Sequence, residues 1–152
     1  MVVPELDSGL GRVAVEPVAA VAGIQNVEGL PERVRAALMA FQRVLLTAFP
    51  GRIRRVILYG SYARGDAVSD SDVDVMIVVA WQEERLPDGF YRSMYCDPRW
   101  QVIVDAAHDV SLEYSVWISP LVVGENRYMA QRRWSFFKEV EREGTVLWQS
   151  SN

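Results

Sequence analysis

The chain has 152 residues, of which 50% are hydrophobic and 24% charged, a composition that fits one globular domain and leaves no room for two. No apolar run reaches the ~20 residues that a membrane span needs, and the acidic start lacks the cations of a secretory signal, so we expect a soluble, cytoplasmic protein. A net charge of −4 disfavours nucleic acid as a partner, and with one cysteine (Cys96) and one histidine (His108) any metal must be held by carboxylates.

The chain begins with a segment that lacks the pattern of a regular element. Residues 1–29 mix proline and glycine with short valine and alanine runs and have neither helical nor strand periodicity, which predicts a flexible N-terminal arm. The folded domain is expected over residues 30–149. From Pro31 apolar residues recur at helical spacing until Pro50-Gly51 ends the run, which predicts an amphipathic helix.

The remaining elements are predicted from β-branched apolar runs and from helical spacing. In chain order they are a strand at 52–60, a strand at 72–80, a helix opened by Asp97-Pro98, a strand at 116–123, a helix at 126–143 and a short strand at 145–148. Each of the first two strands contains an apolar, β-branched run, which arginines flank in the first, so we expect both to lie inside the sheet.

Aromatic residues raise the question of a binding surface. The segment 131–138 contains both cations and aromatic side chains, but the spacing of Trp134, Phe137 and Val140 favours a helix packed on the sheet over a surface that stacks on nucleic acid. Five tryptophans are more than one small core readily hides. Trp81 or Trp117 is therefore a candidate for an exposed contact with a protein partner.

The most informative feature is a turn that could hold phosphate. Gly60-Ser61 lies where a predicted strand ends and a short helical turn begins, and Gly65 is placed to end that turn. Free backbone amides and the Ser61 hydroxyl would bind an anion there, and Gly60 has no Cβ to keep a phosphate from the main chain. Lys138 is the single lysine, so this is not the lysine-bearing loop of P-loop proteins.

The second informative feature is a pair of acids at the start of the next strand. Asp72 and Asp74 are separated by one residue, so their side chains leave the same face with Cα atoms roughly 6.5 Å apart. Two carboxylates at that distance repel by about 3 kcal/mol at an effective dielectric of 20, a cost that bound Mg²⁺ or Mn²⁺ would reverse. If the two strands are neighbours, the turn and the pair face one cleft, an arrangement suited to phosphoryl or nucleotidyl transfer from a metal-bound triphosphate.

The order Gly60-Ser61, ten residues, then Asp72-x-Asp74, with Ala63-Arg64-Gly65 in between, resembles the signature of the polymerase-beta-type nucleotidyltransferases. It is most similar to that of their stand-alone minimal (MNT-type) bacterial members. The resemblance implies an α/β (α+β) fold in which a mixed sheet is flanked by helices, and Mg²⁺-dependent transfer of a nucleoside monophosphate from an NTP. It also implies that Gly60 and Ser61 bind the β- and γ-phosphates while Asp72 and Asp74 ligate metal.

Other residues are weaker candidates for the site. Arg64 could contact phosphate, although a surface ion pair with Asp66 or Asp70 is an equally good interpretation. The family often carries a third carboxylate on its third strand, but residues 116–120 contain no acid. Glu113, just before that strand, is the nearest replacement, followed by two acids of the preceding helix, Asp105 and Asp109.

The leading hypothesis is therefore transfer of AMP from ATP to an acceptor hydroxyl. By resemblance, the partner would be a small helical HEPN-type toxin, for which this protein would be the antitoxin. The chain is short, so the acceptor or a second subunit, in a homo-oligomer for example, must complete the site. Two alternatives stay open: an enzyme that modifies a small hydroxylated compound, as the aminoglycoside-modifying relatives do, or an inactive nucleotide- or partner-binding module of the same fold.

Overall fold

The computed structural model describes residues 27–151, and the arm expected over residues 1–29 lies almost entirely outside them. The elements, in chain order, are α3 (Glu32–Ala48), β1 (Ile53–Tyr59), α4 (Ser61–Arg64), β2 (Val73–Val79), the short 3₁₀ helix η2 (Met94–Cys96), α5 (Pro98–Tyr114), β3 (Ile118–Gly124), α6 (Glu125–Gln131), α7 (Ser135–Glu143) and β4 (Thr145–Gln149). Within the described part of the chain, no helix is both long enough and apolar enough to cross a bilayer.

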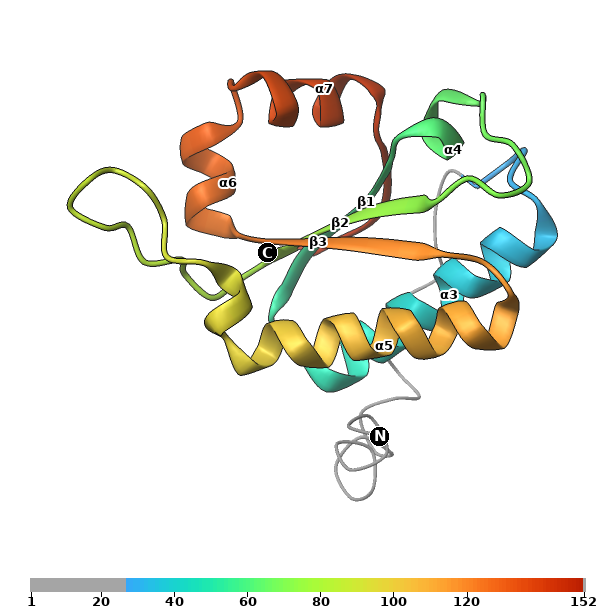
Figure 1. Cartoon of the computed structure of the whole chain (residues 1–152), viewed down its shortest axis with the longest axis horizontal. Coiled ribbons are helices and arrows are strands. Elements are labelled where there is room, and N and C mark those ends of the chain that lie inside the picture. Colours follow the sequence, from blue (N-terminus) through green and yellow to red (C-terminus); the bar gives the residue numbers. More distant parts are fainter. Residues whose placement is uncertain (1–26, 152) are drawn as a thin grey trace.

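The four strands form one mixed sheet in the order β3-β2-β1-β4. β1 is antiparallel to both of its neighbours, whereas β2 and β3 are parallel. Figure 1 shows α3 and α5 under one face of this sheet, α6 and α7 over the other, and α4 at one end. The expected mixed sheet flanked by helices is confirmed, and β1 and β2 are its two inner strands, as predicted.

The two faces of the sheet carry separate apolar cores. In β2, side chains alternate between faces: Val75 and Ile77 pack with α3 and α5, whereas Met76 and Val78 pack with Tyr128 and Phe137 of α6 and α7. Both faces are buried, which explains why this strand is a continuous apolar run. By the same alternation the side chain of Asp74 lies on the α6–α7 face.

The helix predicted over residues 126–143 is wrong, because the chain forms α6 and α7 with a turn between them. The turn covers residues 132–134 and is closed by a hydrogen bond from the Trp134 N–H to the Gln131 carbonyl, 2.8 Å. Tyr128 and Phe137 are nine residues apart, which on one straight helix is about 180° of rotation. Both are buried against the same face of the sheet, so the helix must break between them.

The tryptophans differ from the sequence-based expectations in two of three cases. Trp134 was predicted to pack on the sheet but is 61% exposed, because it lies in the turn between α6 and α7. Trp81, one of two candidates for an exposed surface, is buried beneath the Arg99 guanidinium and against the ring of Phe49. Trp117, the other candidate, is exposed as predicted.

Candidate functional site

Gly60 makes the turn that follows β1 and that the sequence indicates as a phosphate site. Its φ of 78° and ψ of −155° belong to a region that only glycine occupies readily. α4 follows at once, and Gly65 ends it in the left-handed conformation, as predicted. The amides of Ala63 and Arg64 donate to the Gly60 carbonyl, whereas those of Ser61 and Tyr62 have no partner among the described residues. These two free amides and the Ser61 hydroxyl can bind an anion.

The pairing of β1 with β2 brings the acid pair to this turn. Tyr59, the last residue of β1, lies opposite Asp74, and Asp72 immediately precedes β2. A Cβ on Gly60 would lie 3.1 Å from Cγ of Asp74 and closer still to Oδ2. Glycine is therefore required at position 60 for two reasons that the sequence alone does not reveal: the backbone conformation and the close approach of the Asp74 carboxylate.

The surroundings of Asp74 disfavour its charge. Partial burial raises its pKa above the ordinary value of 3.8, the nearby charge of Asp72 raises it further, and the Arg64 guanidinium acts in the opposite direction. Burial, and then the charge of Asp74, also raise the pKa of Tyr59 to about 12. A cation shared by Asp72 and Asp74 would relieve this repulsion.

Arg64, the candidate phosphate ligand, pairs with acids in this structure. Its Nε lies 3.2 Å from Asp66 Oδ2, and its Nη1 lies 3.6 Å from Oε1 of Glu143, at the end of α7. An ion pair with Asp66 is one of the two interpretations that the sequence left open for Arg64. The Arg64 charge also acts on Asp74, and the role of Arg64 at the triphosphate stays a prediction.

The structure does not bring Glu113 to the acid pair. Among residues 27–151, no three acid, histidine or cysteine side chains gather closely enough to hold a metal ion. Glu113 is exposed in the last turn of α5, and its catalytic role stays a prediction. The residue paired with Asp74 on β3 is Ser119, whose side chain lies on the same face of the sheet.

The oxygen donors that are present suit a small hard cation. Mg²⁺ in proteins is usually held by one or two carboxylates together with substrate phosphates and water, rather than by a complete set of protein ligands. Asp72, Asp74 and the anion-binding turn next to them provide those two parts. The donor set therefore fits Mg²⁺ or Mn²⁺ bound with a triphosphate. Such a site does not require a third carboxylate from the protein.

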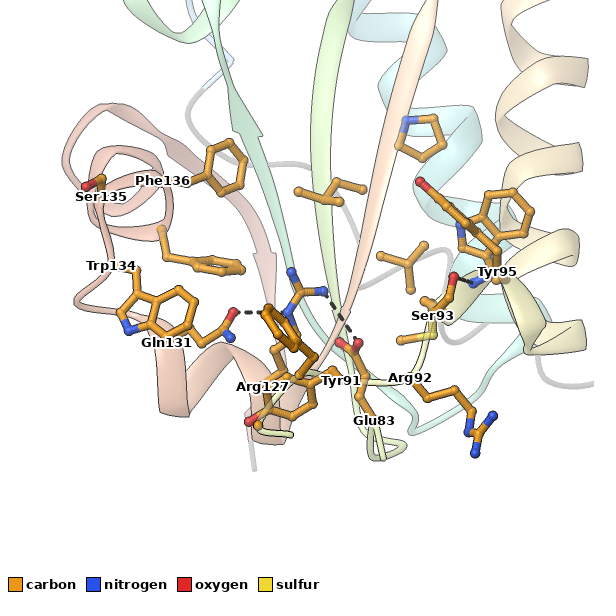
Figure 2. Close-up of a pocket in the computed structure, with 18 of the residues that line it drawn as sticks. Glu83, Tyr91, Arg92, Ser93, Tyr95, Arg127, Gln131, Trp134, Ser135 and Phe136 are labelled. Atoms are coloured by element: carbon orange, nitrogen blue, oxygen red, sulfur yellow. Dashed lines mark hydrogen bonds and ion pairs between the residues drawn. The ribbon is translucent and has the colours of Figure 1, made fainter. Parts of the chain in front are cut away.

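A groove of about 1270 Å³ lies on the α6–α7 face of the sheet. It crosses β3 between residues 88–95 and the turn before α7, and Figure 2 shows Trp134 and Phe136 on one side of the strand and Ser93 and Tyr95 on the other. The ring of Phe136 meets that of Tyr59 edge-on, with centroids 5.8 Å apart. Phe136, which lines the groove, therefore contacts the residue of β1 that pairs with Asp74.

Glu83 is almost fully buried. It anchors the segment that leads from β2 to residues 88–95 of the groove. Its Oε2 accepts a hydrogen bond from the Gly124 N–H at 2.7 Å, and its Oε1 lies 3.4 Å from Nη1 of Arg127. Its backbone N–H and carbonyl both bond to the Asn126 side chain. The sequence analysis did not single out Glu83, Tyr59 or Ser119, because their significance depends on which strands and loops meet in space.

A family model for the nucleotidyltransferase domain matches residues 38–142, which include both the glycine-serine turn and the acid pair. The chain belongs to this family. The expected membership of the nucleotidyltransferases is thus confirmed.

Two curated relatives of this nucleotidyltransferase come from Methanocaldococcus jannaschii. "Putative protein adenylyltransferase MJ0604" is 32% identical over 112 residues, which cover 74% of this chain and 95% of the relative. "Putative protein adenylyltransferase MJ0141" is 36% identical over 107 residues, which cover 70% and 91%.

Two solved structures are more distant. A toxin-antitoxin crystal structure with AMP-PNP is 15% identical, with a TM-score of 0.45 over 80% of this chain and 76% of that chain. A variant of the toxin-antitoxin MntA-HpeT is 16% identical, with a TM-score of 0.43 over 70% and 69%. The assignment of this nucleotidyltransferase rests on the family model and the curated relatives rather than on these scores.

Proposed function

We propose that the protein is a Mg²⁺- or Mn²⁺-dependent adenylyltransferase that transfers AMP from ATP to a hydroxyl group of a protein acceptor. The observation that carries this proposal is the close approach of the Asp74 carboxylate to Gly60, which places a turn with free backbone amides beside a pair of carboxylates. The choice of AMP and of a protein acceptor is supported by the names of the two curated relatives.

Each residue of the site has a definite task in this proposal. Asp72 and Asp74 would hold the metal, which when bound supplies positive charge to the phosphates and lowers the pKa of the attacking hydroxyl. The amides after Gly60 and the Ser61 hydroxyl would bind the β- and γ-phosphates and so stabilise pyrophosphate as it leaves. Arg64 and Glu113 are candidates for assisting roles at the phosphates and at the acceptor.

The reaction balances as a single displacement at the α-phosphorus. The acceptor oxygen forms a bond to that phosphorus, the bond to the bridging oxygen of the β-phosphate breaks, and pyrophosphate carries away the electron pair. The hydroxyl proton leaves to solvent. The chain's part is to align the triphosphate between the turn and the acid pair, so that the α-phosphorus faces the acceptor.

The identity of the acceptor is the finer part of the proposal. We propose a small helical HEPN-type toxin, on the basis of the motif resemblance. A small polycationic compound fits less well, because three arginines, Arg92, Arg127 and Arg133, line the groove on the face of the sheet that carries Asp74. An inactive module is the second candidate, and the observation that favours it is that Ser119, which pairs with Asp74 on β3, is not an acid, although the resemblance implies a third carboxylate on that strand.

The test is transfer of label from ATP that is radioactive at the α-phosphate, with Mg²⁺, to the toxin candidate and to an extract of small metabolites. The Asp72→Asn and Asp74→Asn variants should lose 10²-fold or more of the rate, on the order expected for a lost metal ligand. Asp70→Asn is the matched control, since it removes an exposed neighbouring acid that is outside the pair.

The outcomes separate the candidates. Label on the toxin supports the proposal, and label on a metabolite assigns the protein to the small-molecule enzymes. Binding of Mg-ATP without any transfer identifies an inactive module. Equal transfer by the wild type and by both aspartate variants would contradict the metal site.

A further inference from the structure

The groove beside Tyr59 is larger than a small ligand needs and has the composition of a protein-binding surface. Its volume of about 1270 Å³ exceeds the ~300–1,000 Å³ of typical small-molecule sites. Four aromatic side chains that line it are 47–73% exposed, namely Phe90, Tyr95, Trp134 and Phe136. Exposed aromatic residues gathered with arginine at one depression are typical of the side chains that dominate protein–protein affinity.

The charged residues of the groove indicate the charge of the polypeptide that it would bind. Its two acids are engaged within the protein: Glu83 binds the Gly124 amide and Arg127, and Asp88 accepts a hydrogen bond from the Phe90 N–H. Arg133, by contrast, is exposed and has no ion-pair partner within residues 27–151. A chain with a net charge of −4 thus presents an unpaired cation in this groove, which is complementary to an acidic segment.

The open edge of β3 is poorly suited to binding such a segment as an added strand. The N–H groups of Ile118 and Gly124 point away from β2, and each is bound by a side-chain oxygen, at 2.9 and 2.7 Å. Alternation along the strand turns Pro120 and Val122 to the same edge, and proline has no N–H to offer. On this edge of β3 Val122 therefore keeps the single free N–H, whereas an added strand would draw on a donor at every second residue.

We propose that this groove binds an acidic polypeptide segment of the protein acceptor, through contacts with its apolar and acidic side chains and not as an added strand. This inference rests on the proposed function, because the acceptor must place a hydroxyl near Asp74. The groove is suited to that placement, since Phe136 contacts Tyr59 and Tyr59 lies opposite Asp74. The nucleotide then occupies the turn and the acid pair, while the acceptor occupies the groove.

The test uses the full-length protein and three fluorescent peptides that share apolar side chains and a tyrosine but carry flanks of Glu, Gln or Lys. Fluorescence anisotropy should rank their affinities Glu above Gln above Lys. Trp134→Ala should weaken binding of the Glu peptide about tenfold, and Arg133→Glu should abolish or reverse the ranking. Leu112→Ala is the matched control, because it truncates an apolar side chain that is 65% exposed on α5, outside the groove.

Binding of Mg-ATP, followed by the rise in melting temperature, is measured on the same variants. Loss of peptide binding with an unchanged response to Mg-ATP supports the proposal. Loss of the Mg-ATP response in the Trp134 and Arg133 variants would show that the groove holds nucleotide and would overturn it. Binding of no peptide, or equal binding by all variants, would overturn it too. If the wild type binds the Glu peptide but does not respond to Mg-ATP, the proposed function fails and the groove assignment stands.

Discussion

Gly60 and Asp74 lie so close together that a side chain at position 60 would overlap the Asp74 carboxylate. Gly60→Ala should therefore cost about 2–3 kcal/mol of stability and displace Asp74. Gly65→Ala is the matched control: position 65 also has a positive φ but open space around a new Cβ, so the cost should be about 1 kcal/mol. Urea unfolding measures both, and equal losses for the two variants would contradict a specific contact at Gly60.

Replacing Asp74 should reveal opposite effects on stability and on ligand binding. Asp74→Asn removes a partly buried charge that repels Asp72, so the metal-free protein should become more stable, by about 1 kcal/mol. The wild type should gain about 2.7 kcal/mol from Mg-ATP at a hundred times its Kd, and the variant should lose most of this gain. Thermal unfolding with and without Mg-ATP checks both, and an undiminished ligand response in Asp74→Asn would argue against the metal assignment.

The same carboxylate predicts a pH dependence whose sign can be worked out. Its pKa is raised above 3.8 in the folded protein, so the folded state takes up this proton at a higher pH than the unfolded chain does. The free energy of unfolding contributed by Asp74 should therefore rise as the pH falls through the raised pKa, and level off below 3.8. The difference between wild type and Asp74→Asn isolates this term, and it should shrink toward acid pH. A difference that grows toward acid pH would mean that the pKa is lowered instead.

Ser119 faces Asp74 across the parallel pair of strands, so it is the position at which a third carboxylate can be added. Ser119→Asp should lower the stability of the metal-free protein by repulsion and raise the affinity for Mn²⁺ about tenfold. Ser119→Asn provides the control of similar size without charge. Calorimetric titration of Mn²⁺ in the presence of a non-hydrolysable ATP analogue measures the effect, and equal affinities of the Asp and Asn variants would show that position 119 does not reach the metal.

Glu83 and Glu84 are adjacent in the chain, but replacing them should have very different effects on the free energy of unfolding. Glu83→Ala leaves the Gly124 amide and the Arg127 guanidinium without their buried partner, so it should cost about 3 kcal/mol. Glu84→Ala removes only an exposed pair with Arg92 and should cost less than about 1 kcal/mol. Chemical denaturation of both variants tests this contrast, and similar costs would mean that Glu83 does not anchor the loop.

The local parts of the site could be predicted from sequence, and the parts formed by distant segments could not. The turn at Gly60 and the acid pair lie within fifteen residues of one another, and both were identified correctly as features of strand ends. Ser119 was visible only as the absence of an acid, because its place beside Asp74 depends on the register of a parallel pair. The break before α7 was missed because periodicity alone does not report that Tyr128 and Phe137 face the same core.

The antiparallel pairing of β1 and β2 has a consequence for how this protein can diversify. The residues proposed to bind the triphosphate come from one continuous stretch, residues 53–79, whereas residues 88–95 and 133–137 line two sides of the groove. The groove segments can therefore change in sequence while residues 53–79 stay the same. If the groove binds the acceptor as proposed, grafting these two segments from another family member should change the target while the residues proposed to bind the triphosphate stay the same.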